Sequence, residues 1–182
     1  MNNAIGGVEL SSIARGFDVA DTMLKTSPVK LLLARTVCPG KYIVLVTGEV
    51  ADVQASVDAG GNRGGVSLVD RFVIPNIHPE VMPAISGTAV VDKLEALGVV
   101  EAFSVSALIE GADAAVKAAA VHLIEVRLAM AMGGKAFVTM TGSVAAVDTA
   151  VAAAAAAVGR RGLLVEKVVI PKPRAELLTE LI

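Results

Sequence analysis

The segment GKYIVLVTG at residues 40–48 recurs as GKAFVTMTG at residues 134–142, and this recurrence decides the fold. Further matches extend from it in both directions and keep the same order along the chain. They pair Glu9 with Glu101, Ala20-Asp21 with Ala112-Asp113, Lys25 with Lys117, Arg35 with Arg127, Val53 with Val147, and Val73-Ile74-Pro75 with Val169-Ile170-Pro171. Because the two copies differ in length only at turns, the sequence indicates a tandem duplication of one domain.

The apolar pattern within each copy predicts the element order β-α-β-β-α-β. In the first copy we expect strands at residues 5–11, 29–37, 41–47 and 68–74, and helices at 15–25 and around 50–57. In the second copy we expect the strands at residues 98–103, 121–129, 135–141 and 163–170. The expected fold class is α+β, with two tandem ferredoxin-like βαββαβ domains, each an antiparallel sheet with its helices on one face.

The domain boundaries are expected at turn-forming and polar segments. We place the first domain at residues 1–86, a polar linker at 87–96 and the second domain at 97–182. Ser11-Ser12 follows the first strand and is the expected cap of the first helix. The glycines at positions 60, 61, 64 and 65 are expected to form a loop, and residues 75–85 a short tail of the first domain.

Composition and charge exclude several classes of partner. The 182 residues carry a formal net charge of −2, 54% of them are apolar, and no basic face is interleaved with aromatics, which argues against nucleic acid. No apolar run reaches the roughly 18 residues of a spanning helix, which argues against a membrane. The N-terminus lacks the pattern of a signal peptide, and the single Cys cannot form an internal disulfide. We therefore expect a cytosolic chain whose apolar content is typical of extensive subunit interfaces.

Several of the repeated segments resemble the bacterial microcompartment shell domain. They are Ala20–Lys25, Gly40-Lys41 and Thr47–Val53 in the first copy, and Gly133–Lys135, Thr141–Val144 and Ile170–Arg174 in the second. The resemblance covers nearly the whole chain and points to the tandem-domain shell proteins, which form trimers shaped like hexagonal tiles. It implies a structural homotrimer that packs edge to edge with neighbouring shell proteins, in the shell of a microcompartment in the bacterial cytoplasm.

The first hairpin turn resembles a narrower group within this family. Thr36–Lys41, Asn76–Pro79 and Ala84–Gly87 are similar to the iron–sulfur-binding shell proteins of propanediol-utilisation microcompartments. This resemblance implies that Cys38 of three subunits would hold one [4Fe–4S] cluster per trimer on the central axis. It also implies electron transfer or cluster exchange across the shell, with a redox enzyme of the encapsulated pathway as a further partner. The residues implied to surround the axis are Val37, Pro39 and Gly40 in the first copy, and Met132, Gly133 and Gly134 in the second.

The residues alone leave several roles open for Cys38. A lone cysteine is usually a buried, inert side chain, whereas a Pro-Gly turn favours exposure and function. Three thiolates and a water also suit zinc. A tile whose axial pore passes metabolites or a cofactor needs no metal. A ferredoxin-like regulatory protein that binds a small ligand between subunits is a third alternative.

The resemblance implies a role at the tile edge for four further residues. These are Lys25 and Lys117, which match each other, and Asn76 and Lys172, which also match. The alternative for the two matched lysines is an ion pair with the aspartate four residues earlier. Asn76 departs from the basic residue of the family, and the sequence leaves open whether all six edges of the tile pack alike.

No set of side chains suited to catalysis is evident in the sequence. His78 and His122 fall at non-equivalent positions and belong to no Ser–His–Asp set. Each Gly-Lys pair precedes a strand rather than a helix, so neither predicts a phosphate-binding loop. We therefore expect that the chain is not an enzyme.

Overall fold

The computed structural model describes residues 4–129, 132–161, 163–174 and 176–177. The chain divides into two compact units, Met1–Ile77 and His78–Ile182. Among the described residues, no helix has both the length and the apolar character needed to cross a membrane.

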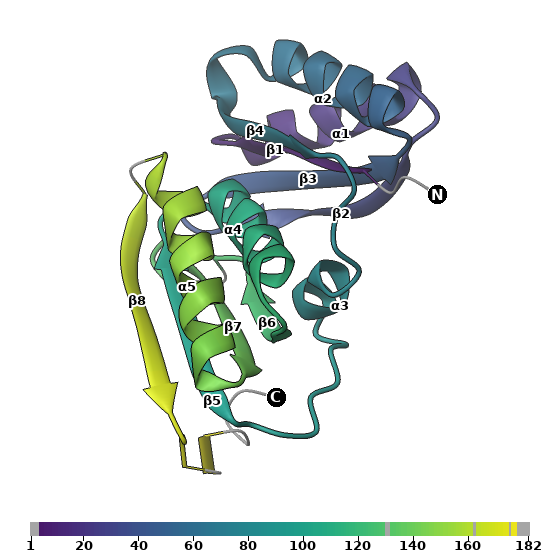
Figure 1. The fold of residues 1–182 in the computed structure, drawn as a ribbon. Coiled ribbons are helices and arrows are strands. Elements are labelled where there is room, and N and C mark those ends of the chain that lie inside the picture. The colour runs from purple at the N-terminus through teal and green to yellow at the C-terminus, as the bar shows by residue number, and fades with distance from the viewer. Residues whose placement is uncertain (1–3, 130–131, 162, 175, 178–182) are drawn as a thin grey trace. The chain divides into compact units, whose positions relative to one another are not determined.

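Unit 1 is a four-stranded sheet covered by two helices. Its elements are β1 (Ala4–Leu10), α1 (Ile13–Thr26), β2 (Lys30–Val37), β3 (Lys41–Gly48), α2 (Val50–Gly64), a short 3₁₀ helix η1 (Gly65–Ser67) and β4 (Leu68–Ile74). The strand order is β2-β3-β1-β4 and every neighbouring pair is antiparallel. Both helices lie on the same face of the sheet (Figure 1). This is the predicted ferredoxin-like arrangement.

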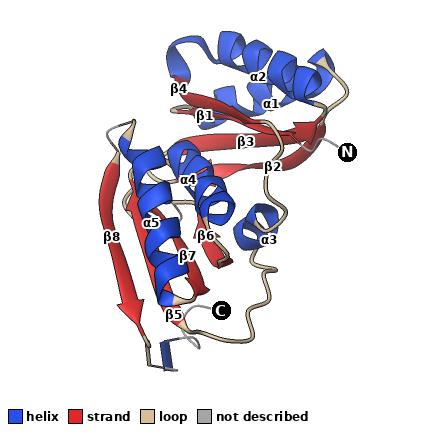
Figure 2. Cartoon of the chain, viewed as in Figure 1, coloured by secondary structure: helices blue, strands red, loops and turns tan. Residues whose placement is uncertain are grey.

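Unit 2 repeats the arrangement and adds one short helix. Its elements are α3 (Val81–Ser86), β5 (Ala96–Ala102), α4 (Val105–Ala118), β6 (His122–Arg127), β7 (Ala136–Gly142), α5 (Val144–Gly159) and β8 (Leu164–Pro171). The sheet order β6-β7-β5-β8 matches that of unit 1 position by position. Figure 2 shows α4 and α5 side by side on one face of this sheet. The predicted duplication and the α+β fold class are confirmed.

The first helix of each copy begins at the same type of cap. Ser12 Oγ accepts a hydrogen bond from Arg15 N at 3.3 Å, and Ser104 Oγ accepts one from Ala107 N at 3.0 Å. Such a cap stabilises a helix by about 1 kcal/mol because it satisfies an otherwise unpaired backbone N–H. The predicted cap is therefore confirmed at Ser12 and recurs in the second copy.

Three of the four glycines expected to form a loop lie inside α2, so that prediction is wrong. A Cβ at Gly60 would lie 2.7 Å from Met23 Cγ, and a Cβ at Gly64 would lie 2.8 Å from Leu10 Cδ2. These two glycines are packing residues that allow α2 to approach α1 and β1. Gly65, at φ +52°, caps the C-terminus of the helix, because this left-handed backbone suits glycine.

Helix α3 is attached to unit 2, although the first domain was expected to continue to residue 86. The backbone N–H of His78 donates to Asp113 Oδ1 at 2.9 Å. Glu80 Oε2 accepts from Leu123 N at 2.9 Å, and Glu80 Oε1 lies 3.0 Å from His122 Nδ1. These bonds hold residues 78–86 against α4 and β6, so the compact units divide between residues 77 and 78.

Candidate functional site

The turn that carries Cys38 is the tip of a tightly paired hairpin. Val37 at the end of β2 pairs with Lys41 at the start of β3, which leaves a three-residue loop. Gly40 has φ +65°, the left-handed conformation that three-residue hairpin loops require near their end. Pro39 and Gly40 are exposed, Cys38 is partly exposed, and a Cβ at Gly40 would meet nothing within 4 Å. The turn is therefore open to the surroundings.

A buried ion pair holds the base of this hairpin. Lys41 Nζ lies 2.8 Å from Glu9 Oε1 on the neighbouring β1, and the Glu9 side chain is only 1% exposed. A buried carboxylate is costly unless a cation pairs with it. In the second copy, Lys135 Nζ lies 2.6 Å from Glu101 Oε1, whose side chain is 27% exposed. Sequence reasoning assigned neither glutamate a role, although both recur with the Gly-Lys segments.

The described residues of one chain do not by themselves provide a metal site. Cys38 is the single cysteine of the sequence, and among the described residues no group of three or more His, Cys, Asp or Glu side chains could hold a metal ion. A [4Fe–4S] cluster normally takes four thiolates and a zinc ion four ligands. The residues fit either group only if several chains bring their Cys38 turns together, which the openness of the turn allows.

The second hairpin turn differs in length and chemistry. Gly133 and Gly134 both have positive φ, 59° and 89°, and Lys135 N donates to Met132 O at 3.1 Å. The turn contains no thiol, and its residues 130–131 lie outside the described residues. The two turns are thus set on matching strands but present different atoms.

Lys25 and Lys117, the two matched lysines expected at the tile edge, each form an ion pair with the aspartate four residues earlier. The surroundings of the two pairs differ. Lys25 Nζ lies 2.6 Å from Asp21 Oδ2, and both side chains are exposed. Lys117 Nζ lies 2.5 Å from Asp113 Oδ2, and this carboxylate is nearly buried and also accepts from His78 N. Lys25 is therefore able to leave its pair at little cost, whereas Lys117 is held by a structural carboxylate.

Asn76 and Lys172 occupy the same corner in each copy. Both are exposed, both follow the Ile-Pro end of a last strand, and both adopt a left-handed backbone, at φ 59° and 50°. Asparagine adopts this conformation readily, and lysine rarely does. The structure therefore treats the two positions as equivalent despite their different side chains.

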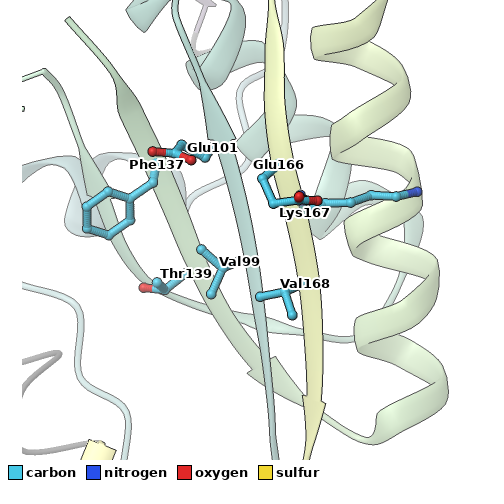
Figure 3. Close-up of a pocket in the computed structure, with 7 residues that line it drawn as sticks. All are labelled: Val99, Glu101, Phe137, Thr139, Glu166, Lys167 and Val168. Atoms are coloured by element: carbon cyan, nitrogen blue, oxygen red, sulfur yellow. The ribbon is translucent and has the colours of Figure 1, made fainter. Parts of the chain in front are cut away.

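A cavity that sequence reasoning missed lies on the face of the second sheet opposite its helices. It has a volume of about 300 Å³ and is lined by Val99, Glu101, Phe137, Thr139, Glu166, Lys167 and Val168 from β5, β7 and β8. Figure 3 shows Val99 and Val168 side by side on β5 and β8, with Phe137 and Thr139 on the adjacent β7. Thr139 is 1% exposed, and its Oγ1 has no hydrogen-bond partner in the described part of the chain.

The duplicated α+β architecture, with its two matched hairpins, defines a class of tandem-domain proteins. The family described as BMC domain matches residues 4–77 and again residues 96–173. The chain therefore belongs to the BMC-domain family and contains two tandem copies of that domain.

Individual relatives agree with this assignment. The chain is 44% identical to the bacterial microcompartment shell protein PduT of Citrobacter freundii, over 100% of this chain and 99% of the relative. A solved microcompartment protein from Desulfitobacterium hafniense DCB is 50% identical, with a TM-score of 0.91 over 98% of this chain and 99% of that one. The fused permuted hexameric shell protein MSM0275 of the RMM microcompartment, at 23% identity and a TM-score of 0.65, covers 87% of this chain and 82% of its own and shows the fold alone.

Family membership settles the broad role of the chain. It is a structural shell protein of a bacterial microcompartment, located in the bacterial cytoplasm, and it is not an enzyme. The predicted family and non-catalytic role are confirmed.

Proposed function

We propose that three copies of this chain assemble into a hexagon-shaped shell tile that carries one [4Fe–4S] cluster on its three-fold axis, held by Cys38 of each copy. The observation that carries the proposal is the position of Cys38. The single thiol of the chain lies at the open tip of a hairpin whose base is held by a buried ion pair. A relative that is 44% identical over the full chain is named PduT, a microcompartment shell protein.

The tandem duplication explains why three thiolates are available. A symmetric assembly of three two-domain chains brings together one Cys38 turn per chain and alternates it with the thiol-free turn of the second copy. Three thiolates leave one iron of a cubane cluster to take a non-protein ligand. When bound, such a cluster supplies one-electron transfer. The protein residues position the thiolates, with Lys41 and Glu9 holding the strands from which the turn projects.

The assembled tile has partners at its edges and on its axis. Lys25, Lys117, Asn76 and Lys172 are the residues that we assign to contacts with neighbouring shell proteins. Lys25 suits this role because its ion pair with Asp21 is exposed and weak. Electron transfer or cluster exchange at the axis requires a redox enzyme of the encapsulated pathway as the partner.

Anaerobic purification followed by metal analysis tests the cluster. We expect brown protein with about four irons and four sulfides for every three chains. Cys38→Ser should remove colour, iron and sulfide while the trimer persists. Val66→Ser, at an exposed position of the same unit, is the control and should keep the colour, the iron, the sulfide and the trimer. Colourless trimers that contain neither iron nor zinc would refute the metal site. Zinc in place of iron would refute the cluster.

A further inference from the structure

The carboxylate of Asp113 on α4 connects Lys117 to the segment at the start of unit 2. Its Oδ2 lies 2.5 Å from Lys117 Nζ, and its Oδ1 accepts the backbone N–H of His78 at 2.9 Å. The Asp113 side chain is only 9% exposed. Because each carboxylate oxygen has a partner and little of the side chain reaches water, the carboxylate is fixed in its direction toward the lysine.

The segment that supplies the His78 N–H is itself held in place. Residues 78–86, which include α3, pack against β6 and α4. Glu80 Oε2 accepts the backbone N–H of Leu123 at 2.9 Å, and Val81 at the start of α3 is fully buried. The N–H that fixes Asp113 therefore comes from a backbone that cannot turn away as an exposed side chain can.

The matching aspartate of the first copy lacks this anchor within the described part of its own chain. Asp21 forms its ion pair with Lys25, and the two side chains are 61% and 74% exposed. The corresponding values for Asp113 and Lys117 are 9% and 40%. Spacing along the helix produces the ion pair in both copies, whereas the backbone of His78 adds a rigid support to the second.

We propose that Asp113 is a positioning residue, which with residues 78–86 behind it holds Lys117 ordered for contact with a neighbouring shell protein. An ammonium group has three N–H donors, and the pair with Asp113 uses one of them. Lys117 can therefore bond to acceptors on a neighbour without leaving its aspartate. A lysine that is already ordered also loses less rotamer freedom on contact. This inference rests on the edge role proposed above for Lys117.

A purely structural Asp113 is the alternative. In that case the carboxylate serves to anchor residue 78, and Lys117 only balances its charge. Asp113→Asn separates the two roles, because the amide oxygen still accepts the His78 N–H while the charge that orders Lys117 is lost. A positioning role makes the effect of Asp113→Asn on assembly depend on Lys117, and a structural role does not.

The critical concentration for assembly of the purified protein into flat sheets, measured by pelleting and checked by electron microscopy, tests the proposal. Asp113→Asn should raise it about two- to tenfold, the range expected when one long side chain must be ordered on contact. Lys117→Ala should raise it at least as much, and adding Asp113→Asn to Lys117→Ala should then change it by less than about twofold. Glu95→Gln, which removes an exposed ion pair with Lys93 in the same unit, should leave it unchanged.

Glu80→Gln provides a second variant that alters neither Asp113 nor Lys117. It should speed hydrogen exchange in residues 79–86, because it weakens their attachment to β6. It should also raise the critical concentration, and only while Lys117 is present. This variant carries the test if Asp113→Asn loses the circular dichroism or the mass of the unmodified protein.

The outcomes separate the positioning role from the edge role. Equal effects of Asp113→Asn with and without Lys117 would overturn the positioning role and keep the edge role. Unchanged assembly in Asp113→Asn and Glu80→Gln, beside a clear loss in Lys117→Ala, would do the same. Unchanged assembly in Lys117→Ala would refute the edge role and the positioning role with it, and would leave the cluster at Cys38 unaffected.

Discussion

The two copies fill the same space between helix and sheet with large and small residues exchanged. Gly16 on α1 faces Tyr42 on β3, and a Cβ at Gly16 would overlap the Tyr42 ring. The matching positions of the second copy hold Leu108 and Ala136, both fully buried. The comparison shows that the two copies keep the space between helix and sheet filled while the residues that fill it change. In the first copy the large residue is on the sheet, and in the second copy it is on the helix.

Exchanging this pair in the first copy gives the largest expected effect. Tyr42→Ala should destabilise unit 1 by about 3 kcal/mol because it leaves a cavity. Gly16→Leu should cost about 3 kcal/mol because the new side chain overlaps the Tyr42 ring. The double variant recreates the Leu108–Ala136 arrangement, so its cost should be smaller than the sum by at least about 2 kcal/mol. Urea unfolding measures all three, and strictly additive costs would show that the two positions are not coupled.

The hairpin bases provide a second comparison with a smaller expected effect. Lys41→Met leaves the Glu9 carboxylate buried without its lysine, which should cost about 2–3 kcal/mol. Lys135→Met should cost about 1 kcal/mol because Glu101 is partly solvated. Thermal unfolding measures both costs. Iron content should fall only in Lys41→Met. Equal losses of stability in the two variants would contradict the argument that the burial of Glu9 makes its ion pair the more important one.

Much of the fold was predictable because it depends on short-range patterns. Alternating apolar strands, helical spacing and the repeated Gly-Lys and Ile-Pro segments predicted both sheets and the position of the Cys38 turn. The Ser12 cap was predictable because it depends on a neighbour three residues away. These features need no knowledge of which distant side chains meet.

The errors and omissions concern contacts between distant residues. Gly60 and Gly64 suggested a loop because their packing partners, Met23 and Leu10, lie far away in the sequence. The attachment of α3 depends on Glu80 reaching Leu123. The cavity on the second sheet depends on which face of each strand remains uncovered, and alternation alone does not specify this. The cluster itself stays a prediction, because its ligand set would come from three chains.

The smallest expected effect concerns the charge at the surface of α1. Hydrogen bonds from Arg63, and then from Arg15, hold the pKa of Asp18 below its ordinary value. The matching Glu110 of the second copy pairs instead with Arg161. Because the folded-state pKa of Asp18 is lowered, its contribution to stability is complete above the ordinary aspartate pKa and is lost as the pH falls through the folded value.

Carboxyl-detected NMR titration of the otherwise unmodified protein can measure this pKa. Arg63→Gln should raise the pKa of Asp18 more than Arg15→Gln, because Arg63 donates two hydrogen bonds, at 2.8 and 2.9 Å, and Arg15 one. The difference should shrink in high salt, since the pairs are exposed. A larger rise in Arg15→Gln would mean that Arg63 is not the dominant partner.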